Sequence, residues 1–122
     1  MRFLKSCNYA LQGIWHCLLR ERNFKIQSTI ALVIFLSGIF FQIKIYEWLA
    51  ILFCAALVLS LELINTAIER LADIVCPTIH PAIRKVKDVA AGAVFFAASA
   101  SCISGLIIFL PKIEHLLKNI LK

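Results

Sequence analysis

The sequence predicts an all-α membrane protein with one N-terminal surface helix and three transmembrane helices. Hydrophobic residues make up 61% of its 122 residues and charged residues only 16%, whereas soluble domains average about 45–50% and about 25%. Two long stretches carry no charge, and a third apolar stretch continues into a strongly helical segment. So apolar a composition excludes a disordered chain, and the length fits one domain, residues 1–122.

Residues 1–23 predict an amphipathic helix lying on the membrane surface. Apolar residues recur there at helical spacing, with Lys, Arg, His and Gln between them. These apolar positions are Leu4, Leu11, Ile14, Trp15, Leu18 and Leu19. The alternative, a soluble tail, does not explain so well formed an apolar stripe.

Three membrane spans are expected at about 24–43, 46–75 and 88–110, followed by a tail at 111–122. Ser28–Ile43 and Val89–Leu110 are uncharged, and about 20 residues at 1.5 Å each cross the ~30 Å hydrocarbon core. The middle span is purely apolar from Trp48 to Leu61 and then acquires charges, so we expect it to emerge on one side. Pro77 and Pro81 are expected to end it and shape a turn.

The distribution of basic residues predicts the orientation. Lys and Arg gather before the first span and between the second and third, whereas the first loop holds only Lys44. By the positive-inside rule the N-terminus and the second connection are cytoplasmic. The net charge of +6 therefore fits a cytoplasmic membrane face and not a nucleic-acid partner. The lysines after residue 110 argue mildly against an external C-terminus.

Polar residues of the second span share one helix face. At about 100° per residue, Asn65, Glu69 and Asp73 lie within about 60° of Glu62. Counted from Trp48, Glu62 lies ~21 Å into the membrane and Glu69 reaches the interface at ~31 Å. Carboxylates in a membrane helix are costly, so the arrangement points to a functional site.

Three further groups are expected at the depth of Glu69. Glu21 precedes the first span, and Lys87 and Asp88 precede the third. A deep carboxylate is suited to taking a proton from a hydroxyl delivered from the bilayer. Two shallower carboxylates suit a hard divalent cation that also binds phosphates, and a nearby lysine suits phosphate charge, so phosphoryl transfer is one interpretation.

Each of these residues also has a plainer interpretation as a buried hydrogen-bonded group or an interfacial charge. No GxxxxGK[ST] or GxGxxG segment occurs, so a conventional nucleotide-binding loop is absent. Composition and spacing alone indicate a membrane enzyme or a carrier with a carboxylate site. The carrier hypothesis is a small proton-coupled protein that uses Glu62 as its coupling residue.

Several motifs resemble the prokaryotic diacylglycerol kinase family over nearly the whole chain. Glu62–Val94 carries E-x-x-N-[TS]-A-I-E, then an Asp and a His, then K-D-x-A-[AS]-G-A-V. Tyr9–Ile14 and Glu21–Ile26 carry Y-A-x-x-G-I and E-R-N-F-x-I. The ERNF form and Gly105–Ile113, GLIIFLPKI, are more similar to the branch that acts on undecaprenol.

The resemblance implies a homotrimer in the bacterial cytoplasmic membrane, with active sites between subunits on the cytoplasmic side. It implies transfer of the ATP γ-phosphate to a membrane lipid alcohol, with Mg²⁺ bridging the ATP phosphates. Undecaprenol is the favoured acceptor. The alternative acceptor is 1,2-diacylglycerol, which would give phosphatidic acid.

The resemblance also implies roles for individual residues. Glu62 is the expected catalytic base, supported by Asn65, and Glu21 and Glu69 are the expected metal ligands. Nucleotide contacts are expected at Tyr9, Glu21, Glu69, His80, Lys87 and Asp88. Substrate contacts are expected at Arg2, Asn23, Gln27, Glu62 and Ala91. Ala91 replaces a serine of the diacylglycerol-specific form and Gln27 a frequent glutamate, so both bear on lipid choice.

Overall fold

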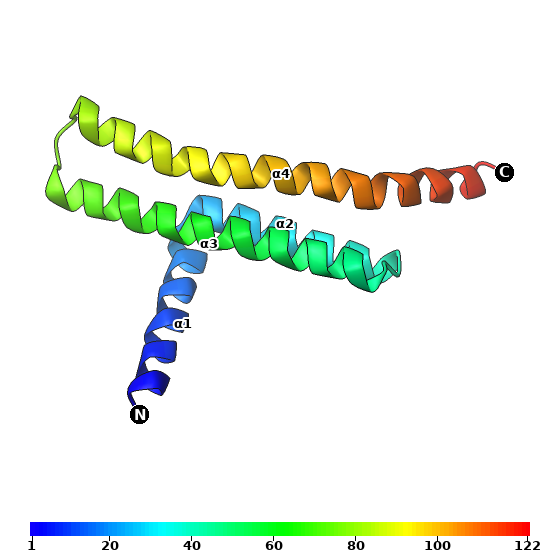
Figure 1. Cartoon of the computed structure of the whole chain (residues 1–122), viewed down its shortest axis with the longest axis horizontal. Coiled ribbons are helices and arrows are strands. Elements are labelled where there is room, and N and C mark those ends of the chain that lie inside the picture. The colour runs from blue at the N-terminus through cyan, green and yellow to red at the C-terminus, as the bar shows by residue number, and fades with distance from the viewer.

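A computed structural model describes residues 1–122 as four α-helices. They are α1 (Arg2–Arg20), α2 (Arg22–Phe40), α3 (Ile45–Val75) and α4 (Pro81–Ile120). In Figure 1, α2, α3 and α4 run side by side, whereas α1 projects away from them and ends at the free N-terminus. α3 packs against both α2 and α4, while the backbones of α2 and α4 do not approach each other.

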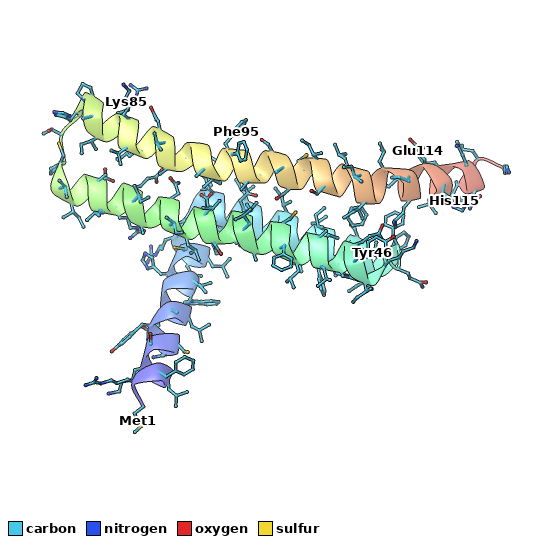
Figure 2. The ribbon with its side chains drawn as sticks, viewed as in Figure 1. Met1, Tyr46, Lys85, Phe95, Glu114 and His115 are labelled. Carbon is cyan, nitrogen blue, oxygen red and sulfur yellow. The ribbon has the colours of Figure 1, made fainter.

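The all-α prediction is confirmed, with α2, α3 and α4 each long and apolar enough to cross a membrane. Only 14 of the 122 residues are buried within the chain. Large apolar side chains project outward from all four helices (Figure 2). In a soluble protein such a surface would aggregate, whereas in a membrane protein lipid or another subunit covers it.

The turn after α2 determines where that helix ends. We expected the first span to reach residue 43, but α2 stops at Phe40. The Gln42 amide donates to Ile39 O at 3.2 Å and the Ile43 amide to Gly38 O at 3.2 Å. This pair of bonds is a Schellman motif, which closes a helix around one left-handed residue. That residue is Gln42, with φ at 50°.

The connection between α3 and α4 corrects part of the sequence prediction. α3 ends at Val75, but Pro81 opens α4 instead of belonging to the turn. Proline suits the first helical position because the missing N–H has no partner there. The His80 Nδ1 accepts a hydrogen bond from the Ala82 amide at 3.1 Å and so caps the helix. α4 therefore begins at Pro81 instead of near residue 88.

Most of the expected tail, residues 111–120, is part of α4, because the helix continues through Pro111 to Ile120. Lys112 holds this part of α4 against the start of α3. Its Nζ donates to Glu47 Oε1 at 2.8 Å and to Ile108 O at 3.2 Å. Glu47 Oε2 in turn accepts from the Lys44 amide at 2.8 Å, which caps α3.

The two ends of the three-helix layer differ in character. The apolar core lies at the α2–α3 turn, where Ile43, Ile51, Ile108 and Phe109 are buried together. The buried polar residues Glu62, Asn65 and Thr66 lie farther along α3, toward the α3–α4 turn. Apolar packing is thus concentrated near the α2–α3 turn, and the buried polar residues are grouped nearer the α3–α4 turn.

Candidate active site

Two buried polar side chains on α3 form the base of the site. Glu62 is 3% exposed and Asn65 is 5% exposed. They stand one turn apart on the face that α2 and α4 cover, as the helical spacing predicts. Because burying a carboxylate is costly, this position indicates a function other than stability.

A groove of about 290 Å³ lies above these two side chains. α2 and α4 form its walls and α3 its floor. The residues that line it are Asn23, Ile26 and Gln27 of α2, Glu62 and Asn65 of α3, and Ala91, Val94, Phe95 and Ala98 of α4. Polar groups at the floor and walls that are apolar except for Asn23 and Gln27 match an amphiphilic ligand such as a lipid alcohol.

The structure brings together most of the side chains for which the resemblance implies a substrate contact. Asn23, Gln27, Glu62 and Ala91 all line this groove. Arg2 does not, because it lies at the free end of α1 beside Met1 (Figure 2). Ile26, Val94, Phe95 and Ala98 were not predicted, although they follow Asn23 and Ala91 at helical spacing.

Further carboxylates lie next to Glu62. The Asn65 Nδ2 donates to Glu69 Oε1 at 3.3 Å, so one amide bridges the floor of the groove and the next turn of α3. Glu21 and Glu69 are both close enough to act electrostatically on Glu62. Glu62, Glu69 and Glu21 thus form a group of carboxylates drawn from α3 and the α1–α2 junction.

Glu21 occupies the elbow between α1 and α2. It is the only residue between the two helices, with extended backbone (φ −97°, ψ 116°), and its side chain caps neither of them. Its Oε1 instead accepts a hydrogen bond from Arg70 Nη2 of α3 at 2.5 Å. Arg70 was not predicted as a site residue, because an arginine that follows Glu69 in sequence reads as an ordinary interfacial charge.

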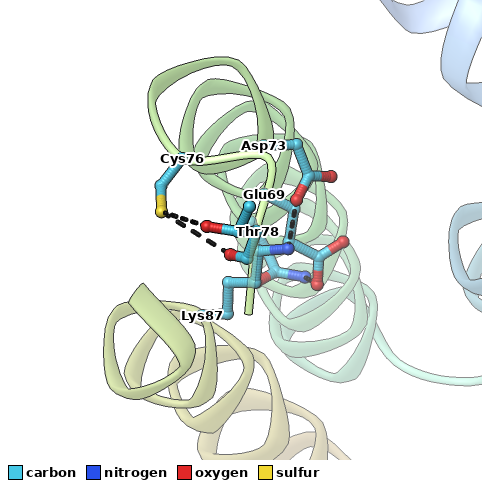
Figure 3. Close-up of polar contacts among 6 residues, drawn as sticks. Glu69, Asp73, Cys76, Thr78 and Lys87 are labelled. Atoms are coloured by element: carbon cyan, nitrogen blue, oxygen red, sulfur yellow. Dashed lines mark hydrogen bonds and ion pairs between the residues drawn. The ribbon is translucent and has the colours of Figure 1, made fainter. Parts of the chain in front are cut away.

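The start of α4 is tied to α3 by a second ion pair. The Lys87 ammonium donates to Asp73 Oδ1 (Figure 3). Asp73 shares the predicted polar face of α3 with Glu69, although it was not among the residues expected to contact nucleotide, metal or substrate. The adjacent Asp88 is exposed. Lys87 of α4 therefore faces the side of α3 that carries Glu69 and Asp73, and its pairing with Asp73 partly neutralises its charge.

Two of the expected nucleotide contacts stand apart from this cluster within one chain. Tyr9 is 67% exposed on α1, and His80 lies in the α3–α4 turn, where it caps α4. No group of three or more His, Cys, Asp or Glu side chains converges closely enough to hold a metal ion. A cation here would have at most two carboxylate ligands from one chain.

The side-chain atoms of Glu21, Glu69 and Asn65 that are available to a metal nevertheless suit Mg²⁺. All are oxygens, and Asn65 Oδ1 is buried with no hydrogen-bond partner. Mg²⁺ is characteristically held by one or two carboxylates, with waters and substrate phosphates completing its shell. An incomplete protein site of this kind therefore fits a metal that arrives with a nucleotide.

Fold and groove together define a class: a membrane protein of three long apolar helices with a buried carboxylate at the floor of a groove between them. The chain belongs to the prokaryotic diacylglycerol kinase family, whose profile matches residues 8–109. It is 43% identical over 112 residues to the undecaprenol kinase of Bacillus subtilis, covering 92% of this chain and 91% of that one. It is 31% identical over 115 residues to a diacylglycerol kinase of Synechocystis sp., covering 93% and 66%. The chain is therefore a lipid kinase.

Proposed function

We propose that this lipid kinase transfers the γ-phosphate of ATP to the hydroxyl of undecaprenol at the cytoplasmic face of a bacterial membrane. The observation that carries the proposal is the buried Glu62 carboxylate at the floor of a groove with mostly apolar walls. The name of the Bacillus subtilis relative favours undecaprenol over diacylglycerol as the acceptor.

In this proposal Glu62 is the general base. The lipid hydroxyl donates its proton to Glu62, and its oxygen attacks the γ-phosphorus as the bond to the bridging oxygen breaks. ADP leaves with that bridging oxygen. The low exposure of Glu62 keeps bulk water from competing as the acceptor. Asn65, one turn from Glu62, donates a 3.3 Å hydrogen bond to Glu69 and so orients the Glu69 carboxylate next to the floor of the groove.

Glu21 and Glu69 would hold Mg²⁺ in this proposal, and Mg²⁺ would supply neutralisation of the phosphate charge. Lys87, paired with Asp73, lies on the same side of α3 and is available to a phosphate. Asp88 is placed beside it for a further nucleotide contact.

The proposed assembly is a homotrimer with sites between subunits. Tyr9, His80 and Arg2 do not reach the Glu62 cluster within one chain, and a second copy would be the natural source of these groups. The exposed apolar side chains of α1, including Leu4, Leu11 and Trp15, support placing that helix on the membrane surface.

A coupled ATPase assay on the detergent-purified, Mg²⁺-supplied protein tests the substrate. We expect ADP release to depend on added undecaprenol, with a higher kcat/KM than for 1,2-diacylglycerol. A higher value for diacylglycerol would transfer the proposal to the alternative acceptor. Turnover with neither lipid, from a folded trimer, would favour the carrier hypothesis instead.

Glu62→Gln tests the proposed base. Glutamine keeps the shape and hydrogen bonding of the side chain but cannot accept the proton, so we expect kcat to fall by at least about 100-fold. Elution volume on size exclusion and helical content should stay unchanged. An amount of activity similar to that of the unmodified chain in a folded Glu62→Gln protein would contradict the assignment.

A further inference from the structure

Arg70 is the one basic side chain that pairs with any of the three carboxylates Glu21, Glu62 and Glu69, and its partner is Glu21. Its Nη2 lies 2.5 Å from Glu21 Oε1. The pair joins the C-terminal part of α3 to the α1–α2 elbow, and it is the only ion pair that reaches the elbow. The pair therefore holds the Glu21 carboxylate, which caps neither α1 nor α2.

The pair is too exposed to serve mainly for stability. The Arg70 side chain is 52% exposed and that of Glu21 28%. Ion pairs between side chains as exposed as these contribute little to stability. The contact instead orients the Glu21 carboxylate, because Oε1 accepts a hydrogen bond from Arg70 while Oε2 accepts none.

We propose that Arg70 is a positioning residue: its hydrogen bond to Oε1 orients the Glu21 carboxylate so that Oε2 faces a divalent cation shared with Glu69. The inference rests on the metal role proposed above for Glu21 and Glu69. Outer hydrogen bonds of this kind orient ligating carboxylates, and their loss typically weakens metal binding by about 10–100-fold. The half-exposed position of this pair favours the lower part of that range.

The proposal and simple electrostatics predict opposite changes in metal affinity when Arg70 is replaced. Arg70 is a cation beside a cation site, so its charge alone disfavours metal binding. Removing only that charge would tighten binding. Removing an orienting hydrogen bond would weaken it, because Glu21 would then swing freely at the elbow. The direction of the change therefore separates the two effects.

The experiment measures Mn²⁺ affinity by electron paramagnetic resonance on the full-length, detergent-purified chain with a nonhydrolysable ATP analogue. We expect Arg70→Gln to weaken Mn²⁺ binding by about 10-fold and Arg70→Lys to recover part of the loss. Arg22→Gln is the matched control, since it removes the same charge next to Glu21 without removing an ion pair. It should leave binding unchanged or slightly tighter.

A double-mutant cycle with Glu21→Gln completes the test. If Arg70 acts through Glu21, Arg70→Gln should have no further effect in the Glu21→Gln background. Unchanged or tighter binding in Arg70→Gln, with Glu21→Gln still weakening it, would overturn the role of Arg70 and leave the metal site intact. No effect from Glu21→Gln would instead overturn the metal assignment of Glu21 itself.

Discussion

Gln42 is the only non-glycine residue with a left-handed backbone, at φ 50°. A residue with a side chain adopts this backbone region at a steric cost that glycine avoids, and the cost is largest for β-branched residues. We expect Gln42→Gly to leave thermal stability equal or raise it by up to about 1 kcal/mol, and Gln42→Val to lower it. Melting of the detergent-solubilised protein measures this order. A Val variant as stable as the Gly variant would contradict the strain at this turn.

Cys17 is a buried thiol on α1, below the carboxylate cluster. Burial raises its pKa, the Glu21 carboxylate raises it further, and Arg70 acts in the opposite direction. Because the thiolate is the reactive form, Cys17 should be largely protonated and slow to alkylate at neutral pH. Its rate should still be rising above about pH 8.5, the ordinary thiol pKa.

Single-cysteine variants treated with iodoacetamide over a pH series measure this rate. Cys7, exposed on the same helix, is the matched control for access of the reagent. Equal rates for the two thiols at neutral pH would show that Cys17 is not shielded. Arg70→Gln should slow Cys17 further, which reports on Arg70 without any metal or nucleotide.

At the scale of the helices, contact between α2 and α3 depends on Gly38. A Cβ built at Gly38 would lie 2.7 Å from Trp48 Cη2 and 3.0 Å from Ile43 Cδ1. The indole cannot move away freely, because it also packs edge-on against Phe35 with ring centroids 5.2 Å apart. We expect Gly38→Ala to destabilise the protein by about 1–3 kcal/mol, as overpacking commonly does.

The control and the rescue are both available in this chain. Gly105→Ala adds the same methyl to α4, where nothing lies within 4 Å, and should be neutral or stabilising. Trp48→Phe should remove much of the penalty from Gly38→Ala, because the ring that clashes is shortened. Equal melting temperatures for Gly38→Ala and Gly105→Ala would refute the close packing.

The helices, their polar face and the bounds of α3 could be predicted from the sequence, but the ends of α2 and α4 and the cross-helix pairs could not. Periodicity places Glu62, Asn65 and Glu69 on one face, because a helix fixes that geometry locally. The extension of α4 through Pro111 brings Lys112 against Glu47, and this contact joins residues that are distant in sequence. The Arg70–Glu21 pair likewise depends on how the elbow packs against α3, and one sequence holds no signal for that.

At the scale of the whole molecule, the ion pair between Lys112 and Glu47 lies at the end of the helical layer opposite the groove. Lys112 Nζ lies 2.8 Å from Glu47 Oε1, with side chains 26% and 12% exposed. It is better shielded than the pairs near the groove, so screening weakens it less. We expect Lys112→Met and Glu47→Gln each to lower stability, with a coupling energy of about 0.5–3 kcal/mol in a double-mutant cycle.

Activity is the second readout for that pair. The Glu47–Lys112 contact lies far from Glu62 along α3, so lipid kinase turnover should persist in both variants below their melting temperatures. Additive losses of stability would show that the two side chains do not support each other. A loss of turnover at low temperature would show that the far end of the bundle shapes the groove.

The continuity of α4 also has a consequence for the surrounding bilayer. Its 40 residues at 1.5 Å each give a rod of about 60 Å, twice the ~30 Å hydrocarbon thickness. Arg84, Lys85 and Lys87 lie near one end and Lys112 and Lys118 near the other. Sliding the rod along the membrane normal would draw charges into hydrocarbon at about 2.5–3.5 kcal/mol each. We therefore expect the basic residues at both ends of α4 to resist movement of the helix along the membrane normal and so to limit how far the groove can shift in depth.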